Sequence, residues 1–377
     1  MSASKQPRSP ARALESEAGI SLGHERQYLI LPVLGQRLEP FILSLGALTA
    51  AMLLFGAFMA LQGIHPVDLY QALYVGSFGT RISIENSLTF AAPILLAALC
   101  TLIPARVGLL VIGGEGAIVL GGLGAVLAGN IASGAYPLLG MTVCLVAGAV
   151  CGGAWIAFAG ALKRGRGVNE TISTLLLNYI AIAILNHLIS GPIRDFSQTL
   201  KAQSWSIPTE FMLGNIPGWS VHWGIVIGVV VCVVLHIFLR YTTFGFSMDV
   251  VGGNNRAAQM SGLPITAIVV ISCALGGAAA GLAGAIEVVA VHGAASESLV
   301  VGFGYTGILV AFLSRQKPLA VILFALLMGG IAASGGLLQR RFDVPYAATA
   351  VLQGIIFLCV LASNALNGRL FPERKSP

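Results

Sequence analysis

Charged residues are scarce in this chain of 377 residues: Asp, Glu, Lys and Arg make up 10% of it, whereas 56% is hydrophobic. Soluble globular domains typically carry about 25% charged residues. So few charges cannot cover a water-facing surface, which excludes a soluble enzyme, a nucleic-acid-binding domain and a disordered chain. The composition therefore predicts an all-α protein, a polytopic helical bundle embedded in a lipid bilayer.

Sequence motifs for catalysis and for metal binding are also missing. The six cysteines lie singly in apolar runs, without the spacing of disulfide or zinc sites. The chain has no GxxxxGK[ST] phosphate loop, no HExxH and no GxSxG sequence. We therefore expect no catalytic residue, no metal and no cofactor on this chain, and no nucleic-acid partner.

Apolar runs close to the length that crosses a bilayer as a helix, about 20 residues, recur along the chain. The eighth run is too short to cross alone, which predicts a half-helix, and the third begins in a glycine-rich stretch, which predicts a break. Segments 1–40 and 364–377 are expected to be tails that flank a transmembrane domain over 41–363. The ten predicted spans are 41–62, 88–104, 108–129, 137–161, 171–190, 222–240, 267–291, 304–314, 318–336 and 346–363.

The distribution of Lys and Arg predicts how these spans are oriented. With the N-terminus in the cytoplasm, sixteen of the 21 basic residues fall on the cytoplasmic side. This division agrees with the positive-inside bias, and the opposite orientation would invert it. Both termini are therefore predicted to be cytoplasmic. The five basic residues predicted to lie outside are Arg81, Arg194, Lys201, Arg340 and Arg341.

Two regions, 88–129 and 304–336, share an order of features: an apolar run, a basic residue with a proline, and a glycine-rich helix. Five spans in each half would place the halves in opposite orientations, as in many transporters. A 5+5 inverted repeat is therefore a further expectation.

Carboxylates at membrane depth are functional candidates because an ionised group there needs a partner or water. Glu115 lies among three glycines, so it is expected to line a pathway or to mark a hinge, or else to be a cytoplasmic helix-start carboxylate. Glu287 is expected to contact the substrate, to share a proton with Glu115, or to lie near the outer interface with His292. Asn178 and Tyr179 are expected either to hydrogen-bond between helices or to line the pathway.

The loop 241–266 is the longest predicted internal cytoplasmic loop. Within it, 250–262 is predicted to form a turn, a short helix and a second turn, because a glycine pair precedes the helix and Gly262-Leu263-Pro264 ends it. A short polar helix between two spans suits contact with a cytoplasmic partner. Its candidate contact residues are Gly253, Asn254, Asn255, Arg256, Ala257 and Ala258.

Several strings along 41–363 resemble, in order, the permease subunits of bacterial ABC importers of the nucleoside and simple-sugar type, within the branched-chain amino acid/ribose permease superfamily. The string 106–116 is similar to that family's GLFNIGAEGQ element, although Val111 replaces its usual Asn. The strings that carry the rest of the resemblance are GVNETISTLLLNYI at 167–180, GPIRD at 191–195, VGGNNRAA at 251–258 and GFGYTGI at 302–308.

The resemblance implies a transport subunit, not an enzyme, that moves a small polar solute, a nucleoside or simple sugar, across the inner (plasma) membrane. It implies three partners: a cytoplasmic ATPase subunit that uses ATP and binds loop 241–266, a second permease subunit (a copy or a paralogue), and a periplasmic or lipoprotein substrate-binding protein. The alternative is a proton-coupled secondary transporter in which Glu287 carries the proton.

Overall fold

Apolar helices account for nearly all regular structure in this computed structural model, which describes residues 45–197 and 201–366. The chain divides into two units: Gly56–Gly354, and Met1–Phe55 together with Ile355–Pro377. The second unit contributes, among the described residues, the beginning of the helix Leu45–Ala60 and the end of the last helix. The predicted tail 1–40 lies outside the described residues, as does the predicted tail 364–377 except for residues 364–366, which are the end of α13.

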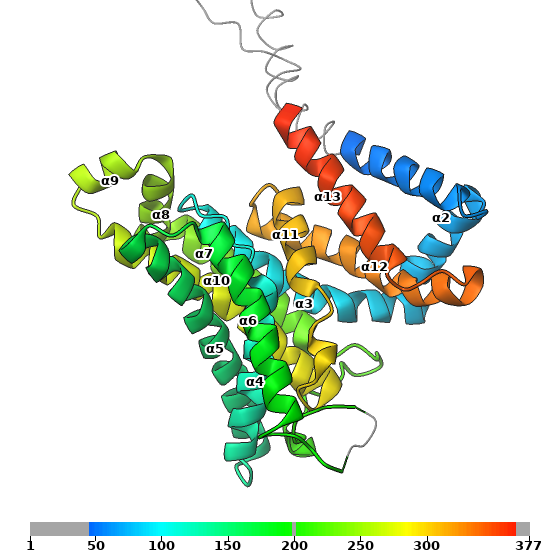
Figure 1. The fold of residues 1–377 in the computed structure, drawn as a ribbon, viewed down its shortest axis with the longest axis horizontal. Helices are drawn as coiled ribbons and strands as arrows, with labels where there is room; N and C mark the ends of the chain where they lie inside the picture. Colours follow the sequence, from blue (N-terminus) through cyan, green and yellow to red (C-terminus); the bar gives the residue numbers. More distant parts are fainter. Residues whose placement is uncertain (1–44, 198–200, 367–377) are drawn as a thin grey trace, which may run out of the picture. The chain divides into compact units, whose positions relative to one another are not determined.

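Figure 1 shows the helices, coloured in their order along the chain. After Leu45–Ala60 they are α2 Pro66–Tyr74, α3 Arg81–Ala105, α4 Gly114–Ile131, α5 Pro137–Arg166, α6 Glu170–Ser190, α7 Gly224–Tyr241, α8 Thr243–Gly253, α9 Asn255–Met260, α10 Ile265–Glu287, α11 Phe303–Leu313, α12 Pro318–Phe342 and α13 Ala348–Leu366.

The ten predicted spans each coincide with an apolar helix. Among the described residues, seven helices are long and apolar enough to cross a membrane, and three shorter apolar helices correspond to the first, eighth and tenth predicted spans. The helix α11 has 11 residues. At 1.5 Å per residue it covers roughly half of the hydrocarbon core of a bilayer, which agrees with the predicted half-helix.

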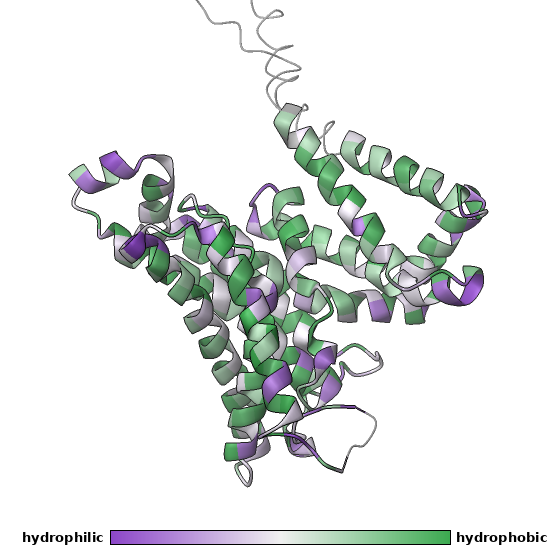
Figure 2. Ribbon diagram, viewed as in Figure 1, coloured by the Kyte–Doolittle hydropathy of each residue, from purple (hydrophilic) through white to green (hydrophobic). Residues whose placement is uncertain are grey.

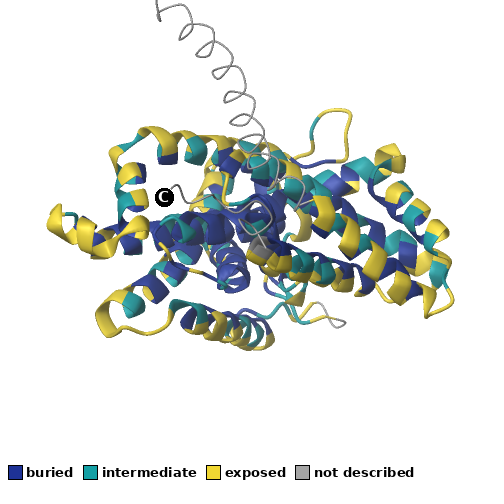
Figure 3. Ribbon diagram, turned by 90° about the horizontal axis from the view of Figure 1, so that it is seen from above, coloured by how far each residue is buried: buried dark blue, intermediate teal, exposed yellow. Residues whose placement is uncertain are grey.

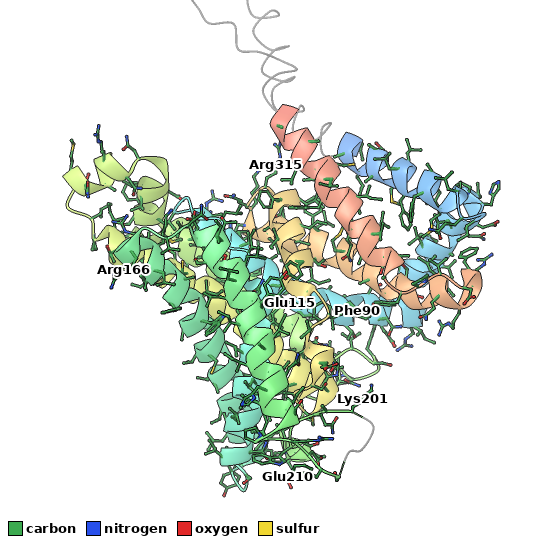
Figure 4. All side chains as sticks on the ribbon, viewed as in Figure 1. Phe90, Glu115, Arg166, Lys201, Glu210 and Arg315 are labelled. Atoms are coloured by element: carbon green, nitrogen blue, oxygen red, sulfur yellow. The ribbon has the colours of Figure 1, made fainter. Side chains whose placement is uncertain are left out.

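Hydropathy and burial follow the pattern of a bundle in lipid. Apolar residues run along the helices, and hydrophilic residues gather at α9 and in the loop between α6 and α7 (Figure 2). Buried residues lie where helices pack together, while exposed residues line their outer faces (Figure 3). Arg166 ends α5 on the same side as α9, whereas Glu210 lies at the opposite end of that helix (Figure 4).

The centre of the larger unit is α10, which packs against α3, α4 and α5. Small residues let these backbones approach closely. A Cβ atom added at Gly152 of α5 would lie 2.5 Å from the Cα of Gly281 on α10. The GxxxG pairs at 148/152 and 277/281 are therefore a real contact between two helices, the kind of packing that small residues permit in membranes.

The cytoplasmic loop differs from its prediction. Residues 250–253 were expected to form a turn, but they are the last residues of α8, an additional helix that the sequence did not reveal. Thr242 begins α8 by accepting a hydrogen bond from the Gly245 amide at 3.2 Å. The predicted short helix is present as α9, and Gly262, with φ of 71°, follows it in a left-handed conformation as expected.

The packing of α5 on α10 makes a prediction about two glycines of the same helix. Alanine normally stabilises a helix relative to glycine by about 0.5–1 kcal/mol. At Gly152 the added methyl group would meet the α10 backbone, and overpacking of this kind costs about 1–3 kcal/mol. We expect Gly152→Ala to lower the thermal unfolding midpoint of the detergent-solubilised protein.

Gly165→Ala is the matched control, because no atom lies within 4 Å of a Cβ at that position. Its midpoint should equal or exceed that of the parent. Equal midpoints for the two variants would show that the contact between α5 and α10 is not tight.

Candidate functional site

A stretch of non-helical backbone separates α3 from α4 within the third predicted span. Residues 109–112 have no regular structure, and Leu109 and Val111 are nevertheless buried. Backbone of this kind is tolerated at membrane depth only where it faces protein or a water-filled cavity, because lipid offers no hydrogen-bond partners. We call this backbone the unwound segment (109–113). Its hydrogen-bond partners show how the structure stabilises it.

The helix α6 supplies most of these partners from one face. Thr171 donates its hydroxyl proton to the Leu110 carbonyl at 3.1 Å, and the Ile112 amide donates to the Thr174 hydroxyl at 3.1 Å. Asn178 donates to the Ile112 carbonyl at 3.0 Å and accepts from the Gly116 amide at 2.8 Å. Positions 171, 174 and 178 are one turn apart on a helix, so a single polar stripe replaces the missing helical hydrogen bonds.

Three further hydrogen bonds involve this segment. Thr101 of α3 donates to the Val111 carbonyl at 3.0 Å. The Leu109 amide donates to the Pro104 carbonyl at 3.1 Å, and the Gly113 carbonyl accepts from Ala117 as the first bond of α4. The unwound segment is thus held in a defined conformation between α3 and α6.

Glu115, in the first turn of α4, joins this helix to α11. Its Oε1 accepts from the Gly302 amide at 2.8 Å and its Oε2 accepts from the Gly304 amide at 2.7 Å. The side chain is 1% exposed. These amides belong to the first turn of α11, where free N–H groups and the helix dipole favour a negative charge.

The close approach of α4 and α11 requires a glycine. A Cβ atom added at Gly304 would lie 2.6 Å from the Cα of Glu115. Phe303, beside it, packs against Phe90 of α3 with ring centroids 6.1 Å apart, and Figure 4 shows Glu115 and Phe90 on either side of the start of α11. The carboxylate therefore links α4 to α11, and the phenylalanine pair packs α11 against α3.

The structure brings three of the four predicted pathway residues together. Glu115 and Asn178 are buried and their polar atoms are occupied by backbone groups, whereas Tyr179 is 62% exposed. Tyr305 of α11, which the sequence did not single out, is 43% exposed and lies near Asn178 and Tyr179. This region thus carries two exposed tyrosines near the buried Asn178 and Glu115.

Glu287 lies elsewhere, at the end of α10. Its Oε2 is 3.6 Å from Nε2 of His292, so the histidine is its neighbour. The Glu115 oxygens accept hydrogen bonds from amides of α11. His292 also borders a cavity of about 590 Å³, which Lys201 and Glu297 line as well.

The predicted coupling residues occupy an exposed end of the molecule. Asn254 caps α9 by accepting from the Arg256 and Ala257 amides at 2.9 and 3.2 Å. Gly253, Asn255, Arg256 and Ala257 are exposed as well, and Ala258 is buried. A short capped helix is thus presented with little cover from its own chain.

The helix α8 connects this exposed helix to the unwound segment. Gly252 lies directly against the Arg106 carbonyl, and a side chain there would collide with it. Arg106 also lies 3.4 Å from the Asp249 carboxylate of α8. Residues 106–108 form the turn that leads into the unwound segment, so α8 contacts the backbone immediately before it.

Residues 83–361 match the protein family described as branched-chain amino acid transport system / permease component. The chain belongs to this family. The permease is also similar over most of its length to three curated proteins. It is 31% identical over 336 residues to the guanosine ABC transporter permease protein NupP of Bacillus subtilis. The aligned region covers 88% of this chain and 96% of the relative.

Two further relatives carry other solute names. The permease is 28% identical over 328 residues to the glucose ABC transporter permease protein TsgB13 of Haloferax volcanii, covering 84% of this chain and 85% of the relative. It is 24% identical over 321 residues to the nucleoside ABC transporter permease protein NupB of Lactococcus lactis, covering 82% and 88%. The permease is therefore a multi-pass membrane protein and a permease subunit of an ABC transporter.

Glu115 gives a direct test of this arrangement. A glutamine at this position keeps the shape of the side chain, but its side-chain nitrogen cannot accept a hydrogen bond from the second backbone amide of α11. A buried donor without a partner costs about 1–3 kcal/mol. We expect Glu115→Gln to lower the thermal unfolding midpoint of the permease and to reduce solute uptake.

Glu210→Gln, a change to an exposed carboxylate outside this region, is the control and should leave the unfolding midpoint unchanged. A Glu115→Gln protein with the midpoint of the parent would contradict the linking role of the carboxylate.

Proposed function

We propose that this permease subunit carries a nucleoside inward across the inner (plasma) membrane, driven by ATP that a separate cytoplasmic ATPase subunit hydrolyses. The observation that carries the proposal is the continuous contact from exposed α9 through α8 to the turn before the unwound segment. A permease that draws its energy from another chain needs such a route, and the three relatives are named as ABC transporter permease proteins.

Under this proposal the ATPase docks on α9. The residues expected to meet it are Gly253, Asn254, Asn255, Arg256, Ala257 and Ala258, all of which lie in or beside α9. Both termini would lie on the same, cytoplasmic side as α9. ATP binding to the partner would then favour one of two positions of α8, which is a population shift between two states.

The contact between Gly252 and the Arg106 carbonyl would transmit this movement to the unwound segment. Because α6 and Thr101 hold that segment by side-chain hydrogen bonds, it can shift by exchanging individual bonds without melting a whole helix. The exposed pair Tyr179 and Tyr305, beside this segment, would change position with it.

A nucleoside fits the tyrosine pair because a base can stack on aromatic rings, and such contacts add to the area that they bury. The relatives named for guanosine and for nucleosides agree with this choice. A simple sugar is the second candidate, and the relative named for glucose supports it. We propose Tyr179 as a residue of the solute pathway, with Asn178 and Glu115 positioning it. A role of Glu287 in this pathway stays a prediction.

Two further partners complete the proposed transporter. A second permease subunit, a copy or a paralogue, would cover an exposed helix face. A substrate-binding protein would deliver the solute to the opposite side, where the loop between α6 and α7 is anchored on the end of α10. In that anchor the Ile207 amide donates to the Gly293 carbonyl and the Leu213 amide to the Val289 carbonyl, each at 2.8 Å.

Uptake into vesicles that contain the permease and its copurifying partners tests the proposal. We expect uptake of labelled guanosine to require ATP and to persist with a protonophore. Arg256→Glu should reduce ATP-dependent uptake at least about tenfold, because a reversed charge on α9 opposes a docking surface that accepts a cation. Its amount in the membrane should equal that of the parent.

Arg341→Glu is the control, since it reverses an exposed charge at the end of α12 and should leave uptake unchanged. Uptake that continues without ATP and collapses with the protonophore would instead identify a proton-coupled secondary transporter. Uptake of glucose and not of guanosine would retain the ABC mechanism and replace the solute.

A further inference from the structure

A cavity of about 710 Å³ lies beside α8. The end of α7, α8, the start of α12 and Arg106 enclose it. Its residues come from four places in the chain, yet the route from α9 to the unwound segment does not use the cavity itself. Its chemistry therefore needs an explanation of its own.

The cavity is strongly basic. Arg106, Arg240 and Lys317 line it with permanent positive charges, and His236 adds a fourth basic side chain. The only acidic residue in its lining is Asp249, whose carboxylate lies 3.4 Å from Arg106. After this pair is subtracted, Arg240 and Lys317 remain as two exposed cations that converge on one space.

The start of α12 adds to this charge. Lys317 is the N-cap of this 25-residue helix and Pro318 is its first residue, so the positive end of the helix dipole faces the cavity lined by both. Anions are favoured at such a helix end, and a lysine and an arginine beside it strengthen the preference. This geometry suits an anion. Phosphate is the commonest biological ligand of matching charge.

The apolar parts of the lining distinguish a lipid from a free phosphate. Phe246 is 70% exposed and Leu319 is 48% exposed, and both line the cavity. The adjoining face of α7 is apolar and open, with Val233, Val234 and Ile237 all exposed. A free anion would leave this apolar surface uncovered, whereas an acyl chain would lie along it.

We propose that this cavity binds the phosphate of an anionic phospholipid, with the headgroup between Arg240 and Lys317 and the acyl chains along α7. Basic cavities between membrane helices on the cytoplasmic side bind anionic headgroups in this way. A lipid bound there would rest against Asp249 and Phe246 of α8, so it would set the position of that helix. The binding itself does not depend on the identity of the transported solute.

The test uses the full-length permease in neutral detergent, with bound lipid counted by native mass spectrometry and stability followed by thermal unfolding. Phosphatidylglycerol should bind and raise the unfolding midpoint, whereas phosphatidylcholine should do neither. Arg240→Gln with Lys317→Gln should weaken phosphatidylglycerol binding at least about tenfold, since each surface cation contributes about fivefold and the two together about thirtyfold.

The control is Arg340→Gln with Arg341→Gln, which removes the same charge from the other end of α12 and should retain binding. If the double variant at 240 and 317 does not elute as a single species, Lys317→Gln alone serves, because this exposed side chain makes the milder change.

Three outcomes would overturn the proposal. One is equal binding of phosphatidylcholine and phosphatidylglycerol, and another is unchanged phosphatidylglycerol binding in the variants. The third is binding of inorganic phosphate that depends on Arg240 and Lys317 while the lipid does not bind, which would identify a free anion as the ligand.

Discussion

The constraint on which this structure depends is the need to satisfy backbone groups inside a membrane. Residues 109–113 interrupt the helix that would otherwise run from α3 into α4, and lipid cannot hydrogen-bond the amides and carbonyls thus freed. Thr171, Thr174 and Asn178 of α6 provide partners for three of them, the Leu110 carbonyl and both backbone groups of Ile112. Glu115 then satisfies the first amides of α11, which is itself too short to cross a bilayer. Two broken spans are therefore held together by a few polar side chains.

This arrangement explains how a protein so poor in charge can respond to events at its surface. Rigid apolar packing, such as the glycine contact of α5 with α10, forms a frame that resists deformation. The unwound segment has partners that can be exchanged singly. It also follows directly after Arg106, against which Gly252 of α8 packs. The basic cavity beside α8 gives the surrounding membrane access to the same helix, so two influences, one from a partner protein and one from lipid, would converge on it.

Much of the fold could be predicted from the sequence because membrane spans depend on composition over long windows. All ten predicted spans coincide with apolar helices, and the break before Gly114 and the shortness of α11 were both expected. Asn169, a residue type that favours helix starts, caps α6 by accepting hydrogen bonds from the amides of Thr171 and Ile172. Local signals failed for α8, because the glycines that end it indicate a turn unless their contact with Arg106 is known.

The function of Glu115 could not be predicted for a related reason: its partners are backbone amides 187 and 189 residues away, and no side-chain pattern marks them. The stripe at 171, 174 and 178 was visible as helical spacing, but its partner segment was not.

The central claim is that the position of α9 controls the unwound segment. Amide hydrogen exchange of the assembled permease and ATPase, with and without ATP, tests this most directly because the Ile112 and Gly116 amides are bonded to Thr174 and Asn178. The account predicts that ATP changes exchange across 109–116 by about tenfold or more, a shift of about 1.4 kcal/mol in the opening free energy, while α5 is unaffected. Exchange across 109–116 that is the same with and without ATP, in a complex that hydrolyses ATP and transports solute, would contradict it.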